Sequence, residues 1–489
     1  MATQITLEPA DKKLKFRKTV PTLVMKFGGT SVGSAEAMAK AAAIVAQERP
    51  RWERLVVVVS ALSGVTDLLL DGARQARQGD SSGFPQARDN LRQRHSAIAN
   101  ALIPAEEPRQ AILAEIDDLL DSFVNLCKAM AVLGEASPRA LDAIASLGER
   151  MSVRLMAGVL NALGLQAAPV EASRLIVTDD HFQDAHPDFA ATARQTVAVL
   201  QPLFERGVMP VVTGFIGAAP DGAVTTLGRG GSDYSAAILG AALQADEVWI
   251  WTDVNGVMTA DPRSVPDART IPELTYREVA ELAYYGARVL HPKTIRPVIE
   301  AGVGLRICNT FNPSHPGTRL VAERLLQPGQ VVRAVTAIRS QCLITIEGRG
   351  MLGVPGVAAR AFSAVASTGT SVPLITQASS EQSICFAVPL SAAEQVLRAL
   401  EKAFAAELTN RDIDRIWLYP EVAIITVVGL GMIHTPGVAG KIFTRLGAEN
   451  INVIAIAQGS SEVSISLVVL AQDADRALRT LHSLILNGS

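Results

Sequence analysis

Hydrophobic residues in the first 310 positions fall into short runs, and helical patterns separate them. Residues 22–27 and 55–59 are apolar on both faces, which is typical of buried parallel strands. Residues 34–47 have helical composition, and Ser34 is placed as an N-cap. Further strands are predicted at 166–170, 208–216, 245–253 and 303–308, with a helix at 189–205. This alternation predicts an α/β domain whose ligands bind at the carboxyl ends of parallel strands.

Two regions depart from this pattern. Residues 85–163 carry apolar positions at helical spacing and predict a helical insertion. Beyond residue 320 an internal repeat appears: Thr345-Ile-Glu-Gly-Arg-Gly-Met351 matches Thr426-Val-Val-Gly-Leu-Gly-Met432, and the same spacing pairs Pro355-Gly-Val-Ala358 with Pro436-Gly-Val-Ala439. Each copy predicts a strand, a glycine turn, a helix and two strands. A module of this size needs its neighbour to bury a full core.

Composition narrows the class of protein. The chain has 489 residues, of which 48% are hydrophobic, and a net charge of −3, so neither nucleic acid nor a membrane is an expected partner. Its four cysteines are far apart, as in a reduced cytoplasmic protein, and no protein-built metal site is expected. Residues 1–20 are polar and basic without an apolar core, which predicts a flexible arm and no secretory signal.

Two glycine-rich loops carry the candidate chemistry. Lys26-Phe-Gly-Gly-Thr-Ser-Val-Gly33 follows the first strand, and Leu227-Gly-Arg-Gly-Gly-Ser-Asp233 precedes a helix. Glycine loops expose backbone N–H groups, and a helix N-terminus favours anions, although a loop with a Ser or Asp N-cap explains either loop alone. Lys26, Arg229 and Asp233 fit phosphoryl transfer, which depends on positioning and charge neutralisation. A carboxylate acceptor is already ionised at pH 7, so no general base is needed.

In combination these motifs resemble the aspartate kinase family. The resemblance rests on the two loops, on Trp251-Thr-Asp-Val-Asn-Gly-Val-Met-Thr-Ala-Asp-Pro-Arg263 and on Val289-Leu-His-Pro-Lys-Thr294, and it extends through the repeat. The amino-acid sequence of the repeat is most similar to the kinase half of bifunctional aspartate kinase–homoserine dehydrogenases. The given sequence ends at Ser489, so no dehydrogenase domain is expected. The resemblance implies an amino-acid-kinase αβα sandwich at 21–320, followed by two α+β, ferredoxin-like ACT modules at 335–410 and 418–489.

The family implies a role for each residue that matches its motifs. Lys26 and Asp233 form the catalytic pair. Substrate-binding residues are Thr30, Ser60, Thr66, Glu149, Arg229 and Ser232. ATP-binding residues are Lys26, Gly28, Gly29, Ser31, Thr252, Asp253, Met258, Arg263 and Arg288. Effector-binding residues are Gln377, Gln458, Gly356, Val357, Gly437 and Val438.

Some of these residues have plainer alternatives. Glu149 could be a solvated helix carboxylate, Thr66 a helix cap, Met258 a packing residue, and Arg263 could close a turn. Arg288 stands where the family often has Lys, which changes the shape of the cation, and many relatives carry Tyr in place of Met258.

The expected activity is transfer of the ATP γ-phosphate to the β-carboxylate of L-aspartate. Mg²⁺ is expected to be held mainly through the nucleotide phosphates. The repeat predicts a homodimer or higher oligomer and feedback by an amino acid, threonine being favoured over lysine. Two alternatives stay open: a kinase for glutamate or acylglutamate, and a catalytically inactive amino-acid sensor.

Overall fold

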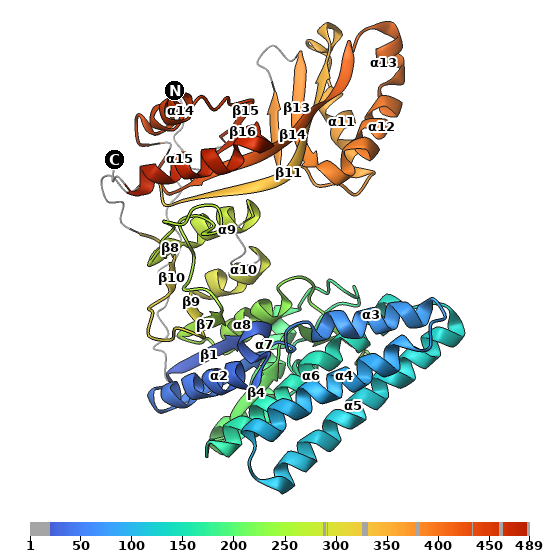
Figure 1. Cartoon of the computed structure of the whole chain (residues 1–489), viewed down its shortest axis with the longest axis vertical. Helices are drawn as coiled ribbons and strands as arrows, with labels where there is room; N and C mark the ends of the chain where they lie inside the picture. The colour runs from blue at the N-terminus through green and yellow to red at the C-terminus, as the bar shows by residue number, and fades with distance from the viewer. Residues whose placement is uncertain are drawn as a thin grey trace, which may run out of the picture.

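Eight strands form the central sheet of the N-terminal part, in the order β3-β4-β2-β1-β7-β9-β10-β8 (Figure 1). In this computed structural model the described residues are 20–286, 290, 292–324, 331–377, 382–432, 434–458 and 463–486, so the predicted arm lies almost wholly outside them. The first six strands of that order, β3-β4-β2-β1-β7-β9, are parallel to one another, and β10 runs antiparallel to β9. The strands are β1 (Thr22–Phe27), β2 (Arg54–Val59), β3 (Ala167–Val170), β4 (Met209–Thr213), β7 (Glu247–Thr252), β8 (Glu273–Thr275), β9 (Gly304–Asn309) and β10 (Thr318–Val321).

Helices cover both faces of this sheet, because successive strand residues point to opposite sides. Leu23, Met25 and Phe27 enter a core with the helices of one face, and Val24 enters a core with those of the other. The predicted αβα sandwich is therefore confirmed. The first face carries α2 (Ala35–Glu48), α3 (Val65–Arg77), α4 (Gly83–Leu102), α5 (Glu106–Leu133) and α6 (Pro138–Ala162). The second carries α7 (Phe189–Glu205), α8 (Gly231–Ala242), α9 (Tyr276–Tyr284) and α10 (Pro292–Ala301).

The predicted strand at 208–216 is too long. Strand β4 ends at Thr213 because Phe215 adopts a left-handed φ of 67° and its N–H donates to Ser235 Oγ at 2.9 Å. The chain then forms a separate hairpin of β5 (Ile216–Ala218) and β6 (Val224–Thr226). This hairpin leads directly into the second glycine loop.

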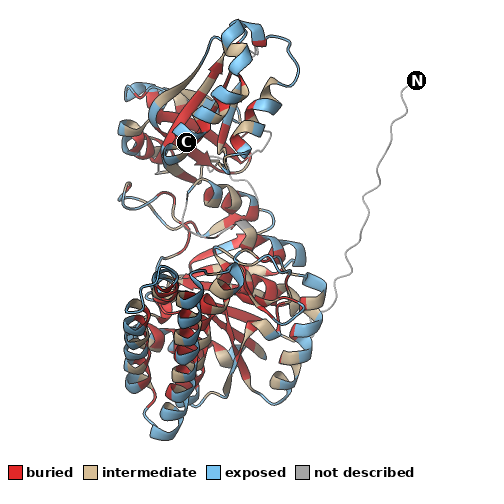
Figure 2. Ribbon diagram, turned by 90° about the vertical axis from the view of Figure 1, so that its right-hand side faces the viewer, coloured by how far each residue is buried: buried red, intermediate tan, exposed pale blue. Residues whose placement is uncertain are grey.

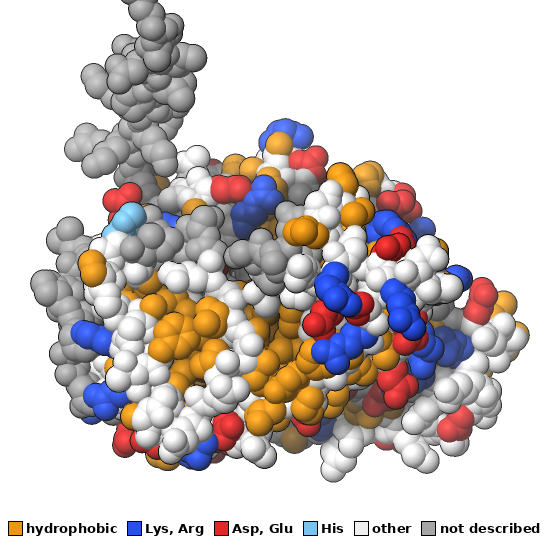
Figure 3. Space-filling view, turned by 90° about the horizontal axis from the view of Figure 1, so that it is seen from above, with side chains coloured by type: hydrophobic (Ala, Val, Ile, Leu, Met, Phe, Trp, Pro, Cys, Tyr) orange, Lys and Arg blue, Asp and Glu red, His pale blue; other side chains and the backbone are white. Residues whose placement is uncertain are grey.

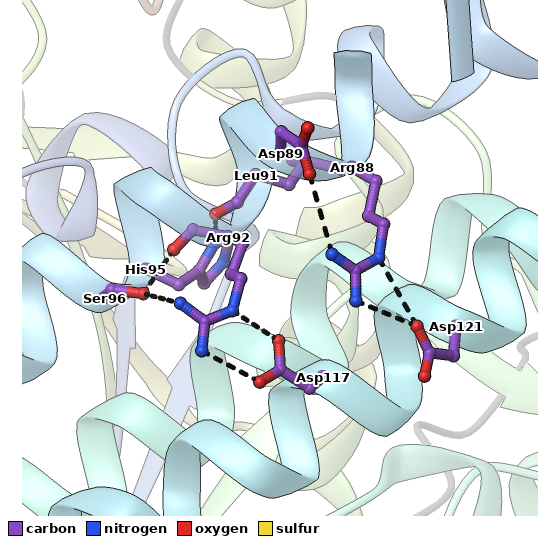
Figure 4. Close-up of polar contacts among 8 residues, drawn as sticks. All are labelled: Arg88, Asp89, Leu91, Arg92, His95, Ser96, Asp117 and Asp121. Atoms are coloured by element: carbon purple, nitrogen blue, oxygen red, sulfur yellow. Dashed lines mark hydrogen bonds and ion pairs between the residues drawn. The ribbon is translucent and has the colours of Figure 1, made fainter. Parts of the chain in front are cut away.

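The predicted helical insertion forms the helices α4, α5 and α6. Buried side chains such as Leu91, Phe123 and Ile144 hold it against the rest of the domain. On its surface Arg92 pairs with Asp117 at 2.8 Å and Arg88 with Asp121 at 3.0 Å (Figure 4). Exposed pairs of this kind contribute about 0–1 kcal/mol each, so the apolar contacts stabilise the insertion. Among the helices in the described ranges, none combines the length and the hydropathy of a membrane span.

The internal repeat forms one continuous antiparallel sheet of six strands, β12-β13-β11-β14-β16-β15. Its two long central strands are shared: residues 334–338 of β11 pair with the end of β14 beside β16, whereas residues 341–347 lie beside β13. The elements are β11 (Ala334–Glu347), α11 (Val357–Ala366), β12 (Leu374–Gln377), β13 (Ser383–Pro389), α12 (Ala393–Ala403), α13 (Ala405–Asn410), β14 (Arg415–Val428), α14 (Val438–Ala448), β15 (Ala455–Ala457), β16 (Ser464–Leu470) and α15 (Ala474–Leu486).

The sequence pattern predicted one helix in each copy of the repeat, whereas the first copy contains two more, α12 and α13, and the second contains one more, α15. Helices α12 and α15 follow the last strand of each copy, and each presents an apolar face to the sheet. The sequence contained a signal for α12, because its buried residues Ala393, Val396 and Leu400 are at helical spacing. We call residues 335–410 module 1 and the described residues from 418 to 486 module 2, although their sheet is continuous.

Short 3₁₀ helices and one short α-helix complete the structure: α1 (Gly29–Val32), η1 (Arg49–Arg51), η2 (Ala172–Arg174), η3 (Arg349–Met351), η4 (Leu390–Ala392) and η5 (Ala471–Asp473).

The N-terminal part and module 2 share a hydrophobic core. Ala260 and Val265, in the loop after β7, are buried in one cluster with Val335 of β11 and Leu478 of α15. Thr259 Oγ1 lies 2.8 Å from His482 Nε2, and its carbonyl accepts from the N–H of Val335 at 2.8 Å. Figure 2 shows buried residues on both sides of this junction. Module 2 therefore holds the loop after β7 in place.

Candidate active site

A cavity of about 510 Å³ opens where β1, β2 and the second glycine loop meet. It is lined by predicted site residues from five separate segments of the chain. These are Lys26, Ser60, Thr66, Glu149, Arg229, Ser232 and Asp233. The resemblance named all seven, and the fold brings them together.

Lys26 lies near the end of β1, and its residue surface is only 8% exposed. Its Nζ pairs with Asp233 Oδ1 at 2.5 Å. A Cβ at Gly28 would lie 3.4 Å from Lys26 Nζ, so glycine leaves room for the ammonium group to move there. Asp233 is in the first turn of α8, where the helix dipole favours a negative charge. The N-cap is Gly230, without a side-chain cap bond, so the plain capping alternative for Asp233 is wrong.

The second loop requires glycine at two positions. Gly228 and Gly230 have φ of 74° and 73°. A Cβ at Gly228 would also lie 2.5 Å from Asp184 Oδ1. Arg229 between them is exposed at the mouth of the cavity and makes no ion pair with any residue in the described ranges. Its guanidinium is therefore available to an anion.

Glu149 is buried, with 4% of its surface exposed, so the solvated-carboxylate alternative is wrong. Burial raises the pKa of Glu149 to about 8, although the Ala61 N–H and the charge of Lys26 act in the opposite direction. Its Oε2 has no hydrogen-bond partner among the described residues. A buried, unpartnered carboxyl oxygen at a cavity wall fits a cationic ligand group.

The first glycine loop shows less direct access than predicted. The Gly28 N–H donates to the Trp251 carbonyl at 3.2 Å, and buried Ser31 donates to the same carbonyl at 3.4 Å. Ser31 Oγ also accepts from Thr310 Oγ1 at 2.7 Å, so this side chain holds the loop against β7. Gly29 begins α1 and Thr30 is exposed. Thr66 is the second residue of α3, after the N-cap Gly64, so it is not a cap.

Three of the predicted nucleotide residues line a different cavity. Asp253, Met258 and Arg263 share a space of about 530 Å³ with residues of β11 and α15, including Arg339 and Leu478. Thr252 Oγ1 donates to Asp253 Oδ1 at 3.2 Å. Arg263 pairs with Asp261 at 2.7 Å, which fits the turn-closing alternative in this conformation. Met258 Sδ accepts from Thr270 Oγ1 at 3.5 Å. The predicted Arg288 lies outside the described residues.

The predicted effector residues separate by module. In module 1, Gln377, Gly356 and Val357 line one cavity of about 390 Å³. In module 2, a space of only about 60 Å³ is lined by Val438 together with Val331 and Val332. Gly437 is the N-cap of α14, and Gln458 is exposed and does not line this space. The two copies of the repeat are not equivalent.

The cavity with Lys26 and Arg229 is also lined by residues that the sequence analysis did not single out, namely Asp142, Gln183, Phe215 and Thr226. Asp142 precedes Glu149 by seven residues on α6, a helical spacing that was a usable signal. No group of three or more His, Cys, Asp and Glu side chains able to hold a metal occurs within the described ranges.

Comparison with known proteins agrees with this architecture. The amino acid kinase family model matches residues 21–309, and the ACT domain model matches 344–404 and 425–484. The bifunctional aspartokinase/homoserine dehydrogenase 1 of Arabidopsis thaliana chloroplasts is 38% identical over 467 residues, covering 94% of this chain and 50% of that protein. The chain thus spans about half the length of such curated relatives. Aspartokinase 3 of Arabidopsis thaliana chloroplasts is 34% identical and is matched over 84% of its length.

Two solved structures are also similar. Escherichia coli aspartokinase III in complex with aspartate and ADP superimposes with a TM-score of 0.78 at 32% identity, over 95% of this chain and 100% of that one. The complex of the same enzyme with lysine and aspartate gives a TM-score of 0.77 at 33% identity, over 95% and 99%.

Proposed function

This chain belongs to the aspartokinases of the amino acid kinase family, and on that premise we propose that it phosphorylates the β-carboxylate of L-aspartate with ATP, giving 4-phospho-L-aspartate and ADP. One observation carries the proposal. The Lys26–Asp233 ion pair, the buried Glu149 and Arg229, which has no ion-pair partner among the described residues, line one cavity.

Each group has a role that follows from its surroundings. Arg229 binds the α-carboxylate of aspartate, since its planar guanidinium matches that group. Glu149, as a carboxylate, binds the ammonium group. Thr30, Ser60, Thr66 and Ser232 contribute polar contacts around the acceptor.

The chemical step forms one O–P bond and breaks another. An oxygen of the ionised β-carboxylate attacks the γ-phosphorus, and the bond to the ADP oxygen breaks. No proton has to leave the acceptor, because a carboxyl group with a pKa of about 4 is ionised at pH 7. Lys26 neutralises charge on the transferring group, and Asp233 holds Lys26 in place. Asp233 is thus an organiser of cations.

The nucleotide is proposed to lie along the segment after β7. Gly28, Gly29 and Ser31 shape the loop beside its phosphates, and Thr252, Asp253, Met258 and Arg263 lie further along. We propose that Mg²⁺ is held mainly through the phosphates, where it would supply further charge neutralisation. Arg263 would have to leave Asp261 to reach a phosphate, and both side chains are at the surface.

Regulation is proposed to act through module 1. Its cavity of about 390 Å³, with Gln377 and the N-terminus of α11, fits an amino-acid effector. We propose threonine as the inhibitor, because of the similarity in the sequence of the repeat. Lysine is the second candidate, because the Escherichia coli relative forms a complex with lysine.

We also propose a homodimer or higher oligomer formed through the modules. Several large apolar side chains of the modules are exposed, and Figure 3, which looks onto this end, shows hydrophobic side chains gathered on the surface. The large apolar side chains of the modules that are exposed include Leu352, Val354, Ile375, Leu390 and Ile456. Contiguous apolar surface of this kind marks protein–protein contacts. The free thiols of the described cysteines suit the reducing cytoplasm, which we propose as the location.

A hydroxamate assay tests the activity, because hydroxylamine traps an acyl phosphate. With Mg·ATP we expect product with aspartate and far less with glutamate or acetylglutamate. Turnover with another acid would move the assignment to that acid, and no turnover with any acid would support an inactive sensor. As a residue-level check, Arg229→Ala is expected to raise the KM for aspartate and to leave the KM for Mg·ATP unchanged.

A further inference from the structure

Two carboxylates of α6 line the active-site cavity, and their surroundings differ. Asp142 and Glu149 are 2% and 4% exposed and lie two helical turns apart on the same face. Glu149 has an oxygen without a partner among the described residues. Asp142, in contrast, has both oxygens bonded to the protein. Glu149 is therefore available to a ligand, and Asp142 serves another purpose.

The bonds of Asp142 join two separate segments to α6. Its Oδ2 accepts from the N–H groups of Gln183 and Thr226, both at 2.9 Å. Its Oδ1 accepts from Thr226 Oγ1 at 2.8 Å. A hydrogen bond in the low-dielectric interior is stronger than the same bond in water, so these three bonds hold both segments to α6.

Both segments border the loop that carries Arg229. Thr226 ends β6, three residues before Arg229, and fixes where the loop begins. Gln183 supports the loop from the other side: its carbonyl oxygen lies 3.3 Å from the position a Cβ of Gly228 would take, and Asp184 Oδ1 lies still closer. Asp184 is itself held by Lys293 at 2.5 Å.

The Gln183 backbone gives a second, independent sign of this role. Its φ of 75° is left-handed, which is unfavourable for a residue with a side chain. The bond from its N–H to Asp142 stabilises that conformation. Strained backbone of this kind persists where the surroundings hold it and is common beside active sites.

We propose that Asp142 is a positioning residue for aspartate binding: by clamping Thr226 and Gln183 it sets the place of the Gly228-Arg229-Gly230 loop and so of the Arg229 guanidinium. The inference rests on the proposed function, since it assigns the acceptor's α-carboxylate to Arg229. It predicts an effect on aspartate binding without contact between Asp142 and the nucleotide.

The test is a kinetic comparison of variants in the full-length chain. Asp142→Ala is expected to raise the KM for aspartate by about ten- to a hundredfold, the scale of a misplaced binding group, and to leave the KM for Mg·ATP within about twofold. Asp142→Asn is expected to restore most of the affinity. Its amide oxygen can accept from both N–H groups, while its NH₂ donates to Thr226 Oγ1, a hydroxyl able to accept.

A double-mutant cycle decides whether Asp142 acts through Arg229. In an Arg229→Ala background, Asp142→Ala is expected to raise the KM for aspartate little further, because the group it positions is gone. If the two effects multiply instead, the proposal is wrong. An Asn variant as impaired as the Ala variant would also overturn it, since charge and not position would then matter.

A matched control lies in the same hairpin. Asp221, in the turn between β5 and β6, accepts from the Ala223 N–H at 2.9 Å and pairs with Arg139 at the surface. Asp221→Ala is expected to leave both KM values unchanged. If Asp142→Ala does not fold, Thr226→Val removes only one of the three bonds and is expected to give a smaller rise in the same KM.

The outcomes separate this inference from the proposed function. Wild-type protein that forms no hydroxamate with aspartate contradicts the function. Active wild-type protein whose Asp142→Ala variant loses thermal stability but keeps its KM for aspartate contradicts the positioning role alone.

Discussion

Aspartate binding is expected to release a proton from Glu149. Burial raises the pKa of this carboxyl to about 8 in the free protein. At pH 7 it is therefore about 90% protonated, from the definition of the pKa. An ammonium group placed beside it stabilises the carboxylate and lowers that pKa. Close to one proton should leave for each aspartate bound at pH 7, and about half a proton at pH 8.

Calorimetry in two buffers with different ionisation enthalpies measures this release directly. The same linkage appears in kinetics: kcat/KM for aspartate, which reports the free enzyme, should rise about tenfold per pH unit below 8 and level off above it. Glu149→Gln should bind aspartate more weakly, with no proton release and without this slope.

The same pKa affects stability, and its sign is opposite to that of a salt-bridged acid. The folded-state pKa lies above the ordinary value of 4.5, so the folded protein holds the proton more tightly than the unfolded chain. The stability from Glu149 is fully present below pH 4.5 and is lost as the pH rises through 8. Aspartate-independent proton release, or a flat kcat/KM profile between pH 6 and 8, would refute the assignment of Glu149 to the ammonium group.

Three further predictions concern other sites. Lys26→Ala should lower kcat by roughly a thousandfold while the thermal unfolding midpoint stays near that of the wild type, because the charge acts on the transferring phosphoryl group; a kcat near normal would remove Lys26 from catalysis. Gln377→Ala should raise the effector concentration needed for half inhibition far more than the matched Gln458→Ala, since only Gln377 lines a large cavity; equal shifts would contradict the non-equivalence of the modules. Thr259→Val should lower the free energy of unfolding by about 1–3 kcal/mol in urea titration, because His482 and the Arg269 N–H lose a buried partner; an unchanged midpoint would show that these bonds are dispensable.

The sequence predicted those parts of the site that are local in the chain. Lys26 with its glycines and Arg229 with Asp233 each lie within one loop after or before a regular element, so their motifs were readable. The parallel strands were readable too, because burial on both faces leaves continuous apolar runs such as residues 55–59.

The sequence could not show contacts between distant segments. Asp142 is joined to Gln183 and Thr226 only through folding. Glu149 read equally well as a solvated helix residue, because its burial depends on how α6 packs against the sheet and the neighbouring helices. Val331 and Val332 close the module 2 space in a way that no repeat alignment reveals.

The burial of Ala260 and Val265 in the core of module 2 bears on how this molecule unfolds and how it can be cut. Removing residues 335–489 would leave two core side chains of the remaining part exposed to water, so an isolated kinase part would start with an aggregation-prone surface. Intact protein should melt in a single cooperative transition across this junction. A nucleotide bound beside the loop after β7 should accordingly protect backbone amides of α15 from hydrogen exchange. This is expected although α15 is far along the sequence from Lys26 and Asp233.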